Sequence, residues 1–313
     1  IVLLAYYIAA INIESSYHDI TNLDYQSFEG ICLTDTFQLH EKEDLVSEIL
    51  IDNSARRIKQ KELDIRVIIG NPPYSAGQDS ANDDNANIEY PLLDKRISET
   101  YIQASQKKGG KRSAYDSYIR AIRWASDRIK DNGVIGFVTN AGFIDSNSAD
   151  GLRKCLEQEF SDMYIFHLRG NQRTVGEQSR KEGGKIFGSG SRAPIAISIL
   201  VKNSNSIKKG NIHFCDIGDY LSREEKLEKI SSLSSIEGIS NINGWKTIQS
   251  DKYGDWINQR DDKFNEYISL GDKKDTDSTV VFKLYSNGVV SSRDEWVFNY
   301  SKDYMVNYLD KMI

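Results

Sequence analysis

The chain has 313 residues, of which 39% are hydrophobic and 27% charged, and it carries a net charge of −6. This composition is typical of a folded globular protein and excludes a disordered or collagen-like chain, while the length predicts one large domain with an appendage, or two domains. The three cysteines, Cys32, Cys155 and Cys215, show no C-x-x-C spacing. Neither a disulfide framework nor a zinc site is therefore indicated, and a reducing, cytoplasmic location is expected.

The chain opens with the apolar stretch IVLLAYYIAAINIE, which we expect to form a buried helix. Its apolar residues number about a dozen, short of the ~20 that span a bilayer, and no basic segment precedes them as in a signal peptide, so no membrane contact is expected. Because no initiating methionine is present, we expect the chain to be part of a longer polypeptide. Residues 31–39 (ICLTDTFQL) predict a short strand running into a loop. Residues 65–69 predict a strand buried on both faces.

Strands and helices then alternate. Apolar spacing predicts a helix over residues 115–130 and another around residues 152–156, and compact apolar runs predict strands at residues 134–139, 163–168 and 194–201. This alternation predicts a parallel, doubly wound α/β sheet, in which the last strand can pair antiparallel because no helix is evident before it. Ser-rich residues 231–244 predict a linker. Two domains are therefore predicted, residues 1–230 and 231–313.

The tetrapeptide Asn71-Pro72-Pro73-Tyr74 follows the predicted strand 65–69, at the strand end where open α/β sheets bind ligands. The two prolines stiffen the backbone and donate no N–H group, so carbonyl oxygens are left to accept hydrogen bonds. The side-chain oxygen of Asn71 and the carbonyl of Pro72 suit a planar NH₂ group, and Tyr74 offers a flat face to the attached ring. A rigid turn with a packed tyrosine is the alternative, but the complete tetrapeptide at a strand end favours a binding site.

This tetrapeptide resembles the Asp/Asn/Ser-Pro-Pro-aromatic motif of the N6-adenine DNA methyltransferases, which use S-adenosylmethionine. The segments AYDSYIRAIRWASDRI, GVIGFVTNAGFI, LRGNQRTVGEQSRKEGGKIFGSGSRAPIAISILVKN and GDWINQRDDKF extend the resemblance to the type ISP-like, helicase-methylase restriction-modification polypeptides. The resemblance implies a Rossmann-like methyltransferase sheet, followed by the start of a target-recognition domain. It also implies double-stranded DNA as substrate and nuclease and helicase domains in the same longer polypeptide. The family's first strand and its Gly-rich cofactor loop would belong upstream of Ile1, which leaves the expected sheet N-terminally incomplete.

By this resemblance, Asn71 and Pro72 would hold the amino group of adenine, Pro73 would complete the stiff corner, and Tyr74 would stack on the ring. Phe187, in a Gly-rich segment, would stack on the other face of a flipped base, or alternatively anchor the loop in the core. Flipping is required because the amino group inside a duplex is paired and cannot meet a methyl donor in line.

Asp35 of LTDTF would, by the same resemblance, bond the adenine of S-adenosylmethionine, with an aspartate that caps a turn as the alternative. The segment GSGSRA imitates a G-x-G-x-x-A cofactor loop, but such a loop follows a strand and opens a helix, and here a strand comes after it. We therefore exclude it. The four histidines show no ligand spacing, so no metal is expected, and His167 is interpreted as a strand residue.

Two basic segments together predict contacts with DNA phosphates, although either one alone would favour a solvated surface. The first contributes four cations within six residues, and the second contributes six cations against two carboxylates. The residues are Lys107, Lys108, Lys111 and Arg112 in the first, and Arg169, Arg173, Arg180, Lys181, Lys185 and Arg192 in the second. In contrast, REEKLEK at residues 223–229 predicts a solvated helix face with charge pairs at helical spacing.

Site-specific, adenine-specific DNA methylation is therefore the leading hypothesis. Adenine in RNA or glutamine in a protein stays open as the substrate, because the same tetrapeptide serves those methyltransferases and a glutamine amide also presents a planar NH₂ group. A third hypothesis is a non-catalytic DNA-binding and target-recognition fragment, which would bind S-adenosylmethionine weakly or not at all.

Overall fold

The structure is a computed structural model, which describes residues 3–39, 51–73, 90–106, 111–187, 192–272, 277–286 and 300–312. The chain divides into two compact units, Ile1–Gln259 and Arg260–Ile313. The domain boundary expected after residue 230 stays a prediction. Strand β6 (Lys246–Ile248) lies beyond it in the sequence and pairs in the sheet of the first unit.

The first unit contains most of the regular structure. Its other strands are β1 (Val67–Gly70), β2 (Asn132–Asn140), β3 (Asp162–Arg169), β4 (Ile195–Asn203) and β5 (Asn211–Asp216). Its α-helices are α1 (Leu3–Thr21), α2 (Ile51–Glu62), α3 (Pro91–Ile97), α4 (Ser117–Arg128), α5 (Gly142–Asp145), α6 (Asp150–Glu159), α7 (Gly176–Glu182), α8 (Arg223–Leu233) and α9 (Ile236–Asn241). Shorter helical turns are Phe37–Leu39, Ser98–Ile102, Lys111–Tyr115 and Asn147–Ala149.

The six strands form one sheet in the order β1-β2-β4-β3-β5-β6. Strand β1 pairs parallel with β2, and β3 pairs parallel with β5. Strand β4 lies between β2 and β3 and is antiparallel to both, and β6 is antiparallel to β5. Four strands therefore point the same way. The predicted Rossmann-like α/β sheet is confirmed, as is the antiparallel pairing allowed for residues 194–201.

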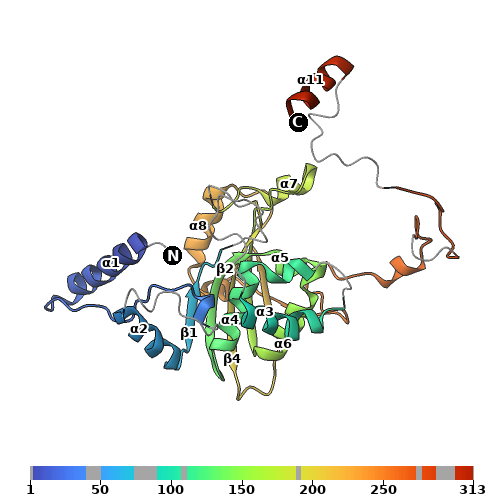
Figure 1. Ribbon diagram of the computed structural model, residues 1–313. Coiled ribbons are helices and arrows are strands. Elements are labelled where there is room, and N and C mark those ends of the chain that lie inside the picture. The colour runs from blue at the N-terminus through green and yellow to red at the C-terminus, as the bar shows by residue number, and fades with distance from the viewer. Residues whose placement is uncertain are drawn as a thin grey trace. The chain divides into compact units, whose positions relative to one another are not determined.

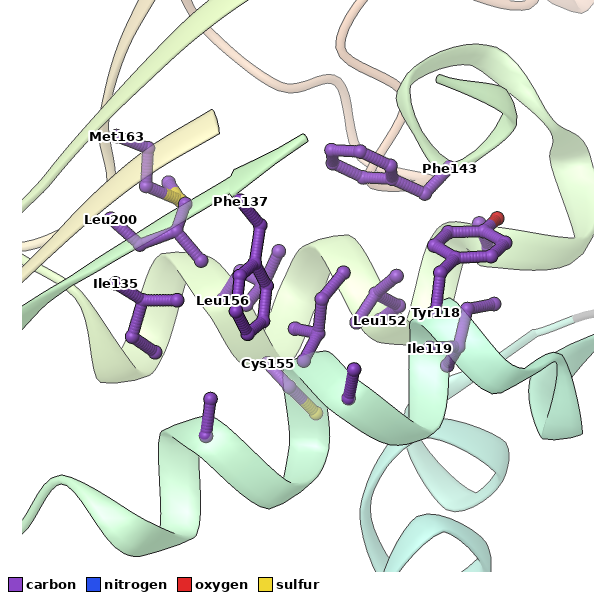
Figure 2. Close-up of a cluster of buried hydrophobic side chains, with 14 of the residues drawn as sticks. Tyr118, Ile119, Ile135, Phe137, Phe143, Leu152, Cys155, Leu156, Met163 and Leu200 are labelled. Atoms are coloured by element: carbon purple, nitrogen blue, oxygen red, sulfur yellow. The ribbon is translucent and has the colours of Figure 1, made fainter. Parts of the chain in front are cut away.

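Helices cover both faces of this sheet, because alternate strand residues point to opposite sides. Met163 and Ile165 of β3 join one buried cluster with α3, α4 and α6, whereas Phe166 and Leu168 join a second cluster with α8 and α9. Figure 1 shows α3, α4 and α6 on one side of the strands and α8 on the other. Figure 2 shows side chains from the strands and helices of the first cluster pointing toward one another: Tyr118, Ile119, Ile135, Phe137, Leu152, Leu156, Met163 and Leu200.

Two sequence predictions about apolar segments are wrong in part. The first helix, α1, is longer than the apolar stretch suggested, and none of its described residues is buried. Strand β1 lies at the sheet edge, with Val67 58% and Ile69 83% exposed, so one of its faces is not covered by the described residues. Among the residues that the structure describes, no helix is both long enough and apolar enough to cross a bilayer.

Two other segments differ in secondary structure. Residues 31–39 form no strand, because the backbone of Leu33 is paired with a side chain. The Leu33 N–H donates to Oδ1 of Asn53 at 2.7 Å, and Nδ2 of Asn53 donates to the Leu33 carbonyl at 2.9 Å. The predicted Ser-rich linker 231–244 contains the end of α8 and the whole of α9, which Ser235 caps by accepting from the Gly238 N–H.

The second unit is smaller. It contains the 3-10 turn Asp262–Glu266, a parallel bridge between Ser269 and Val280, and helix α11 (Lys302–Met312).

Candidate active site

The predicted catalytic segments converge on the edge of the sheet at which its parallel strands end. Strands β1, β2, β3 and β5 run in the same direction, so their carboxyl ends meet at this edge, and β4, which runs against them, begins there. Asn71 follows the end of β1, and Phe187 precedes the start of β4. Residues far apart in the sequence are thus brought to the place where open α/β sheets bind ligands.

The Asn-Pro-Pro corner lies on the surface at this edge. Asn71 and Pro73 are exposed and Pro72 is half-buried. Tyr74 lies outside the residues that the structure describes. The corner therefore lies at the protein surface and is not packed in the core.

The segment that carries Phe187 enters the sheet two strands away from this corner. Ile195, the first residue of β4, is opposite Asn140 of β2, and the Ala141 N–H donates to the Pro194 carbonyl at 2.8 Å. Neighbouring strands lie about 4.8 Å apart, so β1 and β4 are separated by roughly 10 Å. Phe187 itself is half-buried against the second core cluster.

The predicted cofactor residue, Asp35, lies half-buried in the turn before Phe37–Leu39. Its Oδ2 accepts a hydrogen bond from the hydroxyl of Tyr90 at 2.6 Å, and its Oδ1 accepts from the Phe37 N–H at 3.0 Å. The rings of Phe37 and Tyr90 meet edge to face at 5.2 Å. Burial, followed by the hydrogen bond to Asp35, raises the pKa of Tyr90, which keeps this hydroxyl protonated as a donor.

The predicted phosphate-binding cations fall into three groups. Arg173, Arg180 and Arg192 are exposed, and Lys181 and Lys185 are half-buried, all between β3 and β4. Lys107 and Lys108 lie outside the described residues, and of Lys111 and Arg112 only the backbone, in the turn Lys111–Tyr115, is described. Arg169 forms the third group.

Arg169 is engaged inside the protein. Its Nε donates to both carboxylate oxygens of Asp216, at 2.8 and 3.0 Å, and its Nη1 forms an ion pair with Asp219. Burial would raise the pKa of Asp216, but hydrogen bonds from His167, Arg169 and the Gly218 N–H outweigh it and lower the pKa to about 2. Arg169 therefore joins the ends of β3 and β5, and its guanidinium is engaged by two carboxylates of the protein instead of facing a phosphate. His167 is a residue of β3, as predicted, with Nδ1 3.4 Å from Asp216.

Sequence reasoning missed a buried cation beside this edge. Lys226 belongs to the segment predicted as a solvated helix face, yet it is 0% exposed. The prediction is wrong at this residue because the loop between α7 and Phe187 packs over it, and its ammonium donates to carbonyls of that loop. Burial lowers the pKa of Lys226 to about 8, against the opposing influence of the Glu182 carboxylate. The only hint in the sequence is the Gly183-Gly184 pair, which permits such a close approach.

Comparisons with known proteins agree with this architecture. The model of the Eco57I restriction-modification methylase family matches residues 3–172, more than half of the chain. A nuclease-deletion mutant of the Type ISP restriction-modification enzyme LlaGI, in complex with a DNA substrate mimic, is 50% identical with a TM-score of 0.85, over 99% of this chain and 24% of that one. No curated protein matches the chain significantly.

Two further solved structures are similar over the same length. The ATP-dependent Type ISP restriction-modification enzyme LlaBIII bound to DNA is 43% identical with a TM-score of 0.88, over 99% of this chain and 21% of that one. The DrdV–DNA complex is 35% identical with a TM-score of 0.85, over 100% of this chain and 30% of that one. The chain thus spans between about a fifth and a third of the length of these relatives. On these grounds, the chain belongs to the Eco57I restriction-modification methylase family.

Proposed function

We propose that the chain methylates adenine in DNA at N6, site-specifically and with S-adenosylmethionine as the methyl donor. The observation that carries the proposal is the Asn-Pro-Pro corner, which is exposed at the carboxyl end of β1. Its acceptors would bind the two N–H bonds of an aromatic amine, which draws the nitrogen lone pair out of conjugation with the ring. The oxygens concerned are Oδ1 of Asn71 and the carbonyl of Pro72. Positioning of this kind supports attack on a methyl donor without a strong base.

The base would be held flat between two aromatic side chains. Tyr74 continues from the corner, and Phe187 precedes β4. The base would lie beyond the carboxyl ends of β1 and β2, between the corner and the segment that leads into β4, with one aromatic ring on either side. This arrangement requires an adenine that has been extruded from the duplex, since a paired amino group cannot meet a methyl donor in line.

The cofactor would be held in part by Asp35. Its carboxylate is half-buried in the turn that leads to Phe37, and a carboxylate oxygen suits the amino group of an adenine. An acceptor at this place would bind the adenine amino group of S-adenosylmethionine, which supplies an electrophilic methyl group when bound. The backbone N–H of Phe37 and the hydroxyl of Tyr90 hold the Asp35 carboxylate in place for this contact.

The DNA backbone would be bound by the basic segments. Arg173, Arg180 and Arg192 are exposed in the segment between β3 and β4, and phosphate contacts of this kind position a protein on DNA without reading its sequence. The relatives bound to DNA support this part of the proposal. Because LlaBIII is described as ATP-dependent and LlaGI as carrying a nuclease, we propose motor and nuclease domains in the intact polypeptide of this chain as well.

The test is methylation by the intact polypeptide, measured as N6-methyladenine by nucleoside analysis of the DNA. Asn71→Ala and Tyr74→Ala are each expected to abolish the product, because each removes one element of amine or ring binding. Asn205→Ala is the matched control, since Asn205 is an exposed asparagine in the turn after β4, at the opposite end of that strand. Undiminished methylation in both test variants would contradict the proposal. Equal methyl incorporation into RNA in a competition assay would contradict the choice of DNA.

A further inference from the structure

Helix α8 contributes a buried cation to the turn that precedes Phe187. The Nζ of Lys226 donates hydrogen bonds of 2.7 Å to the carbonyls of Glu182 and Gly184. These two carbonyls stand on either side of Gly183, so one ammonium group spans the whole turn. Figure 1 shows α7, which ends at this turn, and α8 at the same end of the sheet.

The turn is built for this close approach. Gly183 has a φ of +65°, and a Cβ added to it would lie 2.1 Å from the Leu221 carbonyl oxygen. A Cβ on Gly184 would lie 2.4 Å from the Arg223 nitrogen, and the Gly184 N–H donates to the Leu221 carbonyl at 2.9 Å. The backbone of the turn therefore rests directly on the segment that leads into α8.

A second cation holds the next part of the loop. The Nε of Arg223 donates to the Ile186 carbonyl at 2.9 Å. Ile186 is 7% exposed in the second core cluster, and Phe187 follows it immediately. Lys226 and Arg223 of α8 thus bind three carbonyls of residues 182–186, the chain that leads to Phe187.

Packing alone does not require a lysine at this position. A methionine of similar length would fill the same space without the cost of burying a charge, but it would leave the two carbonyls of the turn without this donor. Lys226 therefore serves to fix backbone geometry more than to fill a core.

We propose that Lys226 is a positioning residue, which sets the place of Phe187 for stacking on the target base through the carbonyls of Glu182 and Gly184. This inference rests on the proposed function, because it assumes that Phe187 meets an extruded base. Arg223 assists at the next carbonyl. Neither side chain is assigned a contact with the base or the cofactor.

The test compares Lys226→Met with Lys229→Met in the intact polypeptide. Lys229 is a matched control, since it lies one turn further along α8 and its Nζ donates to the Ile217 carbonyl at 2.7 Å, outside the loop. Hydrogen exchange of the amides of residues 183–187, without DNA, reports the turn itself. We expect exchange to rise about tenfold or more in Lys226→Met, because the turn loses two of its hydrogen bonds, and to stay within about twofold of wild type in Lys229→Met.

Duplexes that carry 2-aminopurine at the target position report the stacking of Phe187. Aromatic stacking quenches this base, so bound Lys226→Met is expected to fluoresce more strongly than wild type. On normal duplexes, kcat for methylation should fall about tenfold, the order of one lost stacking contact, while KM for DNA changes less than about threefold. A general loss of folding would lower the yield of folded enzyme instead, without raising the fluorescence of the bound base.

Exchange in Lys226→Met equal to that in Lys229→Met would overturn the inference, and so would faster exchange combined with wild-type fluorescence and kcat. If Lys226→Met does not fold, Arg223→Met decides. Arg223 is exposed, and its substitution takes from the loop the bond to Ile186, together with the 3.7 Å ion pair to the neighbouring Glu224, which lies outside the loop. Exchange of the amides of residues 183–187 at the wild-type rate in Arg223→Met would count against the inference. Failure of the proposed function is recognised separately, by methylation that survives Asn71→Ala and Tyr74→Ala.

Discussion

Replacing Arg153 by methionine is expected to release the segment around Asp255 from the sheet-bearing unit. Arg153, on α6, is 0% exposed. Its guanidinium donates to the carbonyls of Gly254 at 2.6 Å, Phe143 at 2.9 Å and Ser146 at 2.8 Å, and to Oδ1 of Asp255 at 2.6 Å. One side chain thus ties residues 254–255 to the helices that cover one face of the sheet.

The size of the effect follows from these four bonds. Methionine leaves three carbonyls without this donor and the Asp255 carboxylate, which is 2% exposed, without its arginine. Removal of one member of a buried ion pair costs about 3–5 kcal/mol, and the lower end of this range corresponds to roughly 100-fold at 1.4 kcal/mol per tenfold. Local opening of residues 251–257 should therefore become about 100-fold more frequent.

Hydrogen exchange of peptides that cover residues 251–257 measures this opening in the intact protein. Arg120→Met is the matched control, because Arg120 pairs with Asp94 at 2.7 Å between α4 and α3 and should leave this exchange within about twofold of wild type. A rise of less than about tenfold in Arg153→Met would refute the reasoning. It would mean that Trp256, whose Nε1 donates to Glu157 at 2.7 Å, holds the segment without help from Arg153.

Two further predictions concern the sheet. The folded-state pKa of Asp216 is about 2 against an ordinary 3.8, so its stabilisation is present above about pH 4 and is lost as the pH falls toward 2. Urea unfolding should show Asp216→Asn about 2 kcal/mol less stable than wild type at pH 7, with the gap closing near pH 2, and a constant gap would contradict the assignment. Ile69→Lys should reduce self-association of the 313-residue chain in sedimentation velocity, because a charge blocks pairing at an exposed strand edge. Ile207→Lys is its control, because Ile207 is exposed in the loop between β4 and β5 and belongs to no strand. An equal reduction in both would refute the edge argument.

Local sequence patterns predicted most of the sheet. The predicted strands at residues 134–139 and 163–168 lie within β2 and β3, and the one at residues 194–201 lies within β4 except for its first residue. Their apolar runs are buried between layers of helices. No helix was evident before residues 194–201, and this expectation is wrong, because α7 lies between β3 and β4. The antiparallel pairing that it allowed is nevertheless confirmed. Residues 31–39 have the same apolar character but form no strand, since Asn53 supplies the donor and acceptor that a neighbouring strand would have provided.

The candidate site could be predicted only where one segment contains the chemistry. The Asn-Pro-Pro corner can be recognised from its composition and from its place after a predicted strand, and it lies at the surface in the structure. Lys226 and Arg169 could not be assigned in this way, because their partners lie far away in the sequence. Lys226 has the same local pattern as a solvated lysine, and Arg169 has the same pattern as a free cation in a basic loop. Burial and pairing across the fold decide both cases.

The reversed direction of β4 has a consequence for how such enzymes diversify. Since β4 begins where its neighbours end, the chain between Arg169 and Ile195 leaves and re-enters the sheet at the same edge, with no need to return along a face. Insertions or deletions in this excursion would leave the strand registers undisturbed. The segment proposed to contact the target base can thus change in length and sequence, while the sheet beneath it stays the same.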